Sequence, residues 1–183
     1  MDRVQAIEEL NARLSDKKLV RHSLAVEAIM RDLARYFKED VDKWGLTGLL
    51  HDIDYDKTAS DPSKHSQLGA EILEGMGIDN AIVYAVKAHN SLHGLERRRR
   101  LDKALYCVDP VSTLIYDTAL ALPSKKLDAI AVEDILKSIN ENSSDMEADM
   151  NQIRECDQLG LLLAEFVEIA LNAMKRIACT IDL

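Results

Sequence analysis

The stretch Leu49-Leu50-His51-Asp52-Ile53-Asp54-Tyr55-Asp56 places a histidine and an aspartate directly after two apolar residues. Before and after this stretch in the sequence, three further histidines and one aspartate lie on the apolar sides of predicted helices. Imidazole and carboxylate groups that several helices bring inward can replace the water shell of a metal ion. We therefore interpret the following side chains as a metal centre: His22, His51, Asp52, His65, His89 and Asp109.

The composition is that of a helical globular protein. Gly (7) and Pro (3) are scarce and aromatic residues make up only 4%, while Ala, Leu, Ile, Glu and Lys are plentiful. Hydrophobic residues at 47% and charged residues at 30%, in a chain of 183 residues, are typical of one domain with a sizeable core. Because no alternating strand pattern of useful length occurs, the sequence predicts an all-α protein.

Charge and cysteine content restrict the binding partners and the cellular compartment of the protein. The net charge of −9 argues against non-specific binding to nucleic acid or anionic lipid, and nothing in the sequence indicates a nucleic-acid polymer as partner. No apolar run approaches the roughly 20 residues of a membrane span, and the N-terminus lacks a signal-peptide core. Cys107, Cys156 and Cys179 are odd in number and widely spaced. We therefore predict a cytoplasmic protein without a membrane partner.

Hydrophobic periodicity indicates where the helices lie. In residues 20–38, His22 shares one stripe with the apolar side chains, and in residues 78–90, His89 ends such a stripe. Taken alone, His22 also fits a core histidine with a single hydrogen-bond partner. Further helices are predicted at residues 2–14 after an Asp2 cap, at 40–52 after an Asp40 cap, from Asp61-Pro62 to about 76, and at 131–140.

Glycine and proline mark special positions in two of the predicted helices. Gly45 and Gly48 predict close approach by another backbone, because glycine inside a helix otherwise costs about 0.5–1 kcal/mol relative to alanine. Asp109-Pro110 interrupts the helical pattern of residues 101–122, since proline crowds the carbonyl of Tyr106 and cannot donate to it. The sequence leaves two interpretations open: a kinked helix that aims Asp109 inward, or a helix boundary that Asp109 caps.

The C-terminal part carries the strongest amphipathic pattern of the chain. It predicts one long helix from about 150 to 181, with the role of core packing or of a homodimer contact. The most linker-like segment, residues 140–145, precedes it.

The types of the candidate ligands restrict the metal. Imidazole nitrogens and carboxylate oxygens suit Fe, Mn, Co, Ni or Zn. More than four candidates favour two ions over one closed tetrahedral zinc site. His93 is not included among them, because the adjacent Gly94 favours a loop at that position.

His22, then His51-Asp52, then Asp109 resemble the H…HD…D signature of the HD-domain superfamily of metal-dependent phosphohydrolases. His65 and His89 resemble the additional ligands of its dinuclear branch. The resemblance covers about residues 18–115 and is greatest to the small stand-alone HD hydrolases. It implies a single helical domain over 1–183, with an HD core at about 18–122 and a C-terminal helical extension at about 131–182.

The resemblance also implies roles for these residues. Asp52 would bridge two divalent ions, Fe, Mn or Co, with Mg, Ni or Zn as alternatives. A hydroxide formed between them would attack a phosphate ester or anhydride, that of a nucleotide or dinucleotide. His22, His51 and Asp109 would hold the first ion, and His65 and His89 the second.

One departure from the family pattern concerns the residues after the His-Asp pair. Many members have a small residue and a lysine where this chain has Asp54 and Tyr55. Either Lys57 or Lys64 takes over the phosphate contact, or the substrate differs. Asp54 is expected to orient a ligand histidine or to accept a proton, with a solvated loop carboxylate as the alternative.

The run Arg97–Arg100 has two interpretations. Arg97 would contact a phosphate-bearing substrate at the pocket mouth, or the run is a solvated loop before a helix. Two other functions remain beside phosphate hydrolysis: a di-iron HD-type oxygenase acting on a small organic substrate, and a non-catalytic metal-binding or ligand-sensing module.

Overall fold

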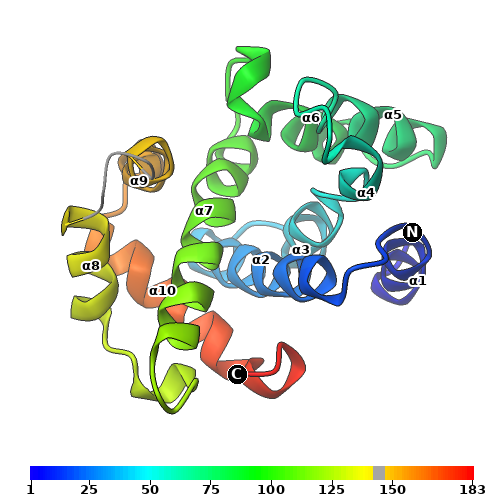
Figure 1. The fold of residues 1–183 in the computed structure, drawn as a ribbon. Coiled ribbons are helices and arrows are strands. Elements are labelled where there is room, and N and C mark those ends of the chain that lie inside the picture. Colours follow the sequence, from blue (N-terminus) through cyan, green and yellow to red (C-terminus); the bar gives the residue numbers. More distant parts are fainter. Residues whose placement is uncertain (142–146) are drawn as a thin grey trace.

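The computed structural model describes residues 1–141 and 147–183, and every regular element within these ranges is a helix (Figure 1). The predicted all-α fold is therefore confirmed. The single-domain organisation stays a prediction. Residues 142–145 of the predicted linker lie outside the described residues.

Aspartate caps begin four of the helices, because a carboxylate accepts from backbone N–H groups that lack a partner in the first turn. Asp2 accepts from the Gln5 amide at 2.9 Å, and Asp40 accepts from the Lys43 amide at 3.0 Å, as the sequence predicts. The helices with such caps are α1 (Arg3–Arg13), α2 (Lys17–Phe37), α3 (Val41–Leu50) and α6 (Asn80–His89). A further single turn, α4 (Tyr55–Thr58), lies where the sequence predicts a loop.

The backbone of α3 contacts the backbone of α2 at Gly48, which confirms the predicted close approach. A Cβ atom at Gly48 would lie 2.9 Å from the carbonyl atoms of Val26, whereas one at Gly45 would meet only the flexible side chain of Arg31. Because Gly48 precedes His51 by one helical turn, this contact also fixes the end of α3 against the helix that carries His22.

We expect Gly48→Ala to lower the free energy of unfolding by about 1–3 kcal/mol, because the added methyl group overlaps the backbone of α2. Gly75→Ala is the matched control, since nothing lies within 4 Å of a Cβ at Gly75. That control should leave stability unchanged or raise it by up to about 1 kcal/mol. Urea unfolding measures both, and equal stability of the two variants would contradict the proposed backbone contact.

Helix α5 (Gln67–Gly75) begins later than predicted, so the expected start at Asp61-Pro62 is wrong. The carboxylate of Asp54 explains the difference. It accepts from the amides of Ser66 at 2.9 Å and Gly69 at 3.0 Å, and so takes the place of a local cap. Ser66 has a left-handed backbone conformation (φ 68°), which these bonds hold in place.

Helix α7 (Arg100–Ala121) continues through Pro110, so the helix-boundary interpretation of Asp109 is wrong. The carbonyl of Tyr106, to which Pro110 cannot donate, accepts instead from the side chain of Gln152 at 2.6 Å. Gln152 belongs to the C-terminal part of the chain. A distant side chain therefore satisfies the carbonyl that the proline leaves without its helical partner.

The predicted long C-terminal helix is broken. Gly160 has a left-handed conformation (φ 80°) and separates two helical segments. The apolar residues on both sides of the break pack into one core, which explains why their stripe extends across it. The dimer contact stays a prediction. Before the break lie α9 (Glu147–Arg154) and the 3-10 helix η4 (Glu155–Leu159), and after it lies α10 (Leu163–Arg176). The separate helix predicted at residues 131–140 is present as α8 (Val132–Glu141).

Two hydrophobic clusters hold the fold together. One joins α2 and α7 to the C-terminal helices, and the other joins α1, α3, α5 and α6. Helices α2, α3 and α6 contribute apolar side chains to both clusters. These helices and α7 carry His22, His89 and Asp109, and α3 ends at the His51-Asp52 pair, so two cores fix the positions of these ligands. Among the described residues, none of the helices combines the length and the apolar character that crossing a bilayer requires.

Candidate metal centre

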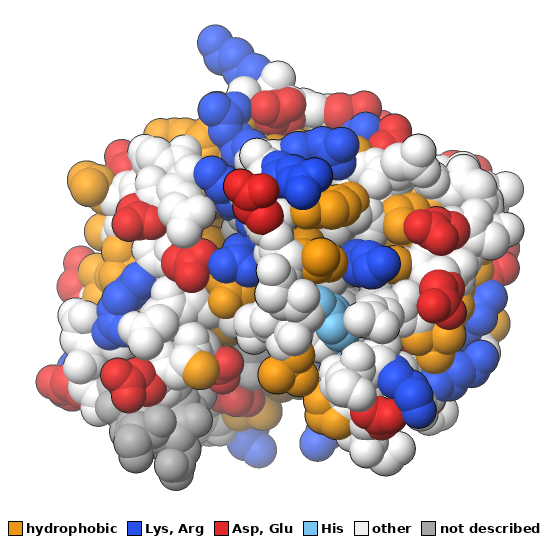
Figure 2. Space-filling model, turned by 90° about the horizontal axis from the view of Figure 1, so that it is seen from above, with side chains coloured by type: hydrophobic (Ala, Val, Ile, Leu, Met, Phe, Trp, Pro, Cys, Tyr) orange, Lys and Arg blue, Asp and Glu red, His pale blue; other side chains and the backbone are white. Residues whose placement is uncertain are grey.

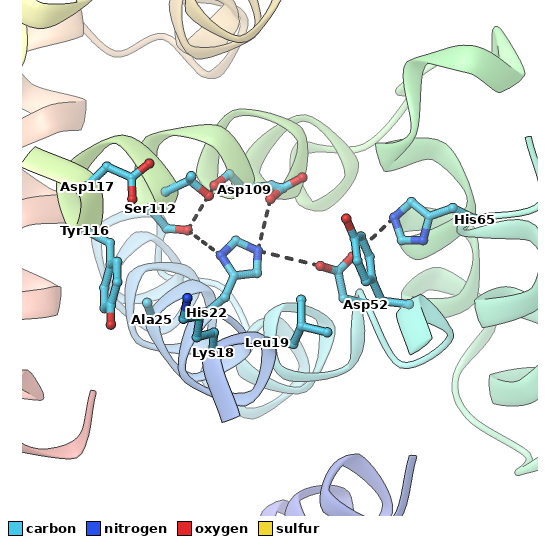
Figure 3. Close-up of a pocket in the computed structure, with 12 residues that line it drawn as sticks. Lys18, Leu19, His22, Ala25, Asp52, His65, Asp109, Ser112, Tyr116 and Asp117 are labelled. Carbon is cyan, nitrogen blue, oxygen red and sulfur yellow. Dashed lines mark hydrogen bonds and ion pairs between the residues drawn. The ribbon is translucent and has the colours of Figure 1, made fainter. Parts of the chain in front are cut away.

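The structure brings all six predicted ligands together from separate parts of the chain. Figure 3 shows four of them, His22, Asp52, His65 and Asp109. Helix α2 supplies His22, α6 supplies His89 and α7 supplies Asp109. The end of α3 supplies the adjacent pair His51 and Asp52, and the turn before α5 supplies His65.

The first set of ligand atoms surrounds the Nε2 atom of His22. This atom lies 3.1 Å from His51 Nε2 and 3.1 Å from Asp109 Oδ1. Asp52 Oδ2 lies 3.3 Å from His51 Nε2 and 3.7 Å from His22 Nε2. Two imidazole nitrogens and two carboxylate oxygens therefore face a common point.

The second set of ligand atoms lies on the other side of Asp52. Its Oδ1 atom is 3.2 Å from His65 Nε2 and 3.5 Å from His89 Nε2. The two imidazole nitrogens are 3.2 Å apart. Each oxygen of the Asp52 carboxylate therefore faces a different pair of histidines.

The two buried histidines are oriented by backbone carbonyls at helix ends. His51 Nδ1 lies 2.8 Å from the carbonyl oxygen of Gly48, and His89 Nδ1 lies 2.6 Å from that of Val86. A carbonyl oxygen only accepts, so Nδ1 carries the hydrogen and Nε2 presents its lone pair to the cluster. This is the tautomer that binds a metal through Nε2.

The other two histidines are oriented by side chains. His65 Nδ1 lies 3.1 Å from Asp54 Oδ1, which can only accept while ionised. His22 Nδ1 lies 3.2 Å from the hydroxyl of Ser112, which donates its own hydrogen to the Asp109 carbonyl. Both Nδ1 atoms therefore donate, and both Nε2 lone pairs point inward. The ligand atoms of His22, His51 and Asp109 lie within 4.8 Å of one another, as do those of His51, Asp52 and His89, and such nitrogen and oxygen sets fit a divalent transition metal.

Asp54 is not a solvated loop carboxylate, because only 1% of its surface is exposed. One oxygen accepts from His65, and the other accepts from the amides of Ser66 and Gly69. A Cβ at Gly69 would lie 3.3 Å from this carboxyl group, so glycine gives it room. With both oxygens engaged, Asp54 has the geometry of a group that orients a ligand histidine.

The electrostatics of the cluster keep its carboxylates ionised. Burial opposes ionisation of Asp52, but the charge and hydrogen bond of His51 hold its pKa well below the usual range. The pKa of Asp109 is likewise lowered, because hydrogen bonds from His22 and His51 outweigh its burial. The carboxylates in turn raise the pKa of His65 to about 9 against the effect of its burial. In the metal-free protein, protons therefore compete with cations for the imidazoles.

This competition predicts how stability depends on pH. In metal-free protein, His65 binds a proton more tightly in the folded state than in the unfolded state. Its contribution to the free energy of unfolding is therefore complete below about pH 6.5 and is lost as the pH rises to about 9. We expect the free energy of unfolding to fall by on the order of 1 kcal/mol over this window. Urea unfolding of chelator-treated protein measures the change, and His65→Gln should reduce it. A slope unaffected by His65→Gln would contradict the prediction.

Three predicted substrate-contacting residues lie elsewhere. The side chain of Lys57 is exposed, and Lys64 pairs with Asp61 at 2.8 Å. Arg97 pairs with Glu155 at 3.1 Å and lies over an aromatic ring of α7. None of the three lines either of the two cavities described below. The structure does not bring them to the cluster.

Two further arginines of the run, Arg98 and Arg100, are also engaged in ion pairs. Arg98 pairs with Glu96 at 3.3 Å, and Arg100 pairs with Glu39 at 3.0 Å.

Basic side chains gather on the face seen from above, where one histidine side chain is visible among uncharged atoms (Figure 2). His93 bonds the carbonyl of His65 at 2.7 Å and so supports the chain beside the cluster.

A cavity of about 370 Å³ opens onto the cluster and contains residues that the sequence analysis missed. Lys18 enters it one helical turn before His22, and residues one and two turns after Asp109 line the same space (Figure 3). Helical spacing from the ligands is the signal that finds them. These further lining residues are Ser112, Thr113, Tyr116 and Asp117.

Comparison with known proteins agrees with this arrangement. The family model of the HD domain matches residues 19–111, a range that includes all six candidate ligands. The chain belongs to the HD-domain family, whose members are mostly metal-dependent phosphohydrolases. Over 92 residues it is also 29% identical to ribonuclease Y of Lawsonia intracellularis (strain PHE/MN1-00). That match covers 50% of this chain and 18% of the relative, so most of the relative has no counterpart in it.

Proposed function

We propose that this protein hydrolyses a small nucleotide-type phosphate with two divalent ions, Fe, Mn or Co, at the Asp52 cluster. The observation that carries the proposal is the position of the Asp52 carboxylate, whose two oxygens face separate sets of imidazoles at 3.2–3.7 Å. Divalent ions in such a site lower the pKa of water and polarise phosphate oxygens.

The protein side chains determine the direction from which a substrate approaches. His51 and His89 are buried, whereas His22, His65 and Asp109 line the cavity of about 370 Å³. A phosphate group therefore enters on the side of these three ligands. Carboxylates in ligand positions hold the ions, and the oriented Nδ1 bonds keep the imidazoles from turning away.

The remainder of the cavity fits a nucleotide-type substrate. Lys18 offers one positive charge for a phosphate oxygen, in the role that the sequence suggests for Lys57 or Lys64. Tyr55 and Tyr116 offer aromatic surfaces, and Asp117 can accept hydrogen bonds from hydroxyl or amino groups. The likeness to a protein named as a ribonuclease supports the same substrate class.

Metal analysis together with a substrate panel tests this function. We expect about two equivalents of metal in protein purified without chelator, and phosphate or nucleoside release after reconstitution with Fe, Mn or Co. Reconstitution with Mg, Ni and Zn is tested in the same way. Oxygen consumption with ferrous iron, without phosphate hydrolysis, would identify an oxygenase instead. Metal binding without either reaction would identify a non-catalytic module.

A further inference from the structure

Two cavities are each lined by the candidate ligands His65 and Asp109. The first, of about 370 Å³, continues along α2 and the second half of α7. The other, of about 270 Å³, lies among the residues that follow α4 and α6 and reaches α9. Both are lined by Tyr55, His65 and Asp109. The two spaces therefore meet at these residues and are otherwise formed by different parts of the chain. A smaller cavity, of about 130 Å³, is lined by Asp109 and by no other candidate ligand.

The two cavities differ in their chemistry. The first has charged side chains, Lys18 and Asp117. Apart from the shared cluster residues, the second is lined by uncharged groups, among them Asn90, Ser91 and Gln152. Gln152 is held at this wall because its amide donates to the Tyr106 carbonyl that Pro110 leaves free. The C-terminal extension, beyond the stretch that matches the family model, thus contributes to the second cavity.

We propose that the substrate is a phosphodiester, with its phosphorus at the cluster and one organic arm in each cavity. This inference rests on the proposed function and specifies the bond that is cleaved. A monoester has one organic arm and would leave one cavity without a ligand group. A pyrophosphate-linked compound carries additional negative charge, and Lys18 is the single lysine or arginine among the residues that line the two cavities.

The reaction balances without a further reactant. Water oxygen forms a bond to phosphorus, and the phosphorus–oxygen bond to one arm breaks. The departing oxygen takes a proton and leaves as an alcohol, while the other arm keeps a phosphate monoester and one further proton is released to solvent.

Paired model substrates test the proposal in metal-loaded full-length protein. We expect kcat/KM for bis(p-nitrophenyl) phosphate to exceed that for p-nitrophenyl phosphate by at least about tenfold. Ser91→Trp, which fills the second cavity, should lower the diester value by at least tenfold and the monoester value by much less. Gln158→Leu, on the exposed surface of η4, is the control and should change neither.

Binding gives a readout that does not depend on turnover. In Zn²⁺-loaded protein, dibenzyl phosphate should shift the backbone amide resonances of residues in both cavities, including Lys18 and Ser91. Benzyl phosphate should shift those of one cavity. If dibenzyl phosphate shifts the resonances of one cavity alone, the proposal is overturned. This test uses protein without the substitution, so it remains decisive if Ser91→Trp fails to fold.

The outcomes separate this inference from the function on which it rests. Preferred hydrolysis of the monoester, or equal losses for both esters in Ser91→Trp, would overturn the diester assignment and leave phosphate hydrolysis standing. Hydrolysis of neither ester or of any compound in the phosphate panel would overturn both.

Discussion

Replacement of Asp52 by alanine should remove both metal ions and reduce the rate of phosphate hydrolysis by at least about 10³-fold. This factor corresponds to about 4 kcal/mol of transition-state stabilisation that depends on the metal. The reason is geometric, because this carboxylate alone faces both sets of histidines in the described cluster. Elemental analysis of the purified variant measures the first effect, and phosphate release measures the second.

Asp56→Ala is the matched control for this experiment. Asp56 lies in the same His-Asp stretch, but its carboxylate accepts from the Ser15 amide at 2.7 Å and is exposed. It should retain the metal and the activity. Circular dichroism should show similar helix content in both variants, since the Asp52 side chain caps no helix. Full activity of Asp52→Ala would refute the proposed centre.

Replacement of Asp54 by asparagine should weaken the ion near His65 and His89 by about 10–100-fold and leave the other ion bound. The amide nitrogen of asparagine would face either His65 Nδ1–H or the amides of Ser66 and Gly69, and a donor cannot accept from a donor. We also expect a loss of about 1–3 kcal/mol in the free energy of unfolding.

A stepwise metal titration by calorimetry measures this selective loss. Asp61→Asn serves as the control, because Asp61 is a partly exposed loop carboxylate whose pairing with Lys64 involves no ligand histidine. If Asp54→Asn binds both ions as tightly as this control does, Asp54 has no orienting role. If both ions are lost together, the two sets of ligands are not separable in the way the distances suggest.

The structure also explains why some sequence predictions succeeded. The caps at Asp2 and Asp40 depend on the nearest few residues, and these contacts are present. The inward direction of His22 and His89 follows from the 3.6-residue period of their own helices. Such features are local, so a single sequence contains the information that predicts them.

The start of α5, which was predicted wrongly, and the path of α7 through Pro110, which the sequence left open, share a different physical origin. The break in the predicted C-terminal helix, by contrast, lies at a glycine, Gly160. The start of α5 depends on Asp54, which reaches the amides of Ser66 and Gly69 across a turn. The continuity of α7 depends on Gln152, which bonds the Tyr106 carbonyl from another helix. No local propensity encodes contacts between segments so far apart along the chain, and tertiary packing overrides the local turn and cap signals there.

The sequence by itself determined the helical class, the family and the set of six ligand types, because periodicity and residue order are properties of the chain alone. Tertiary structure decided which lysine lines the cavity beside the cluster, Lys18 and neither Lys57 nor Lys64, and how each histidine is oriented. It also decided that two cavities meet at His65 and Asp109. The physical reason is that side-chain direction and enclosed space arise only when helices pack against one another.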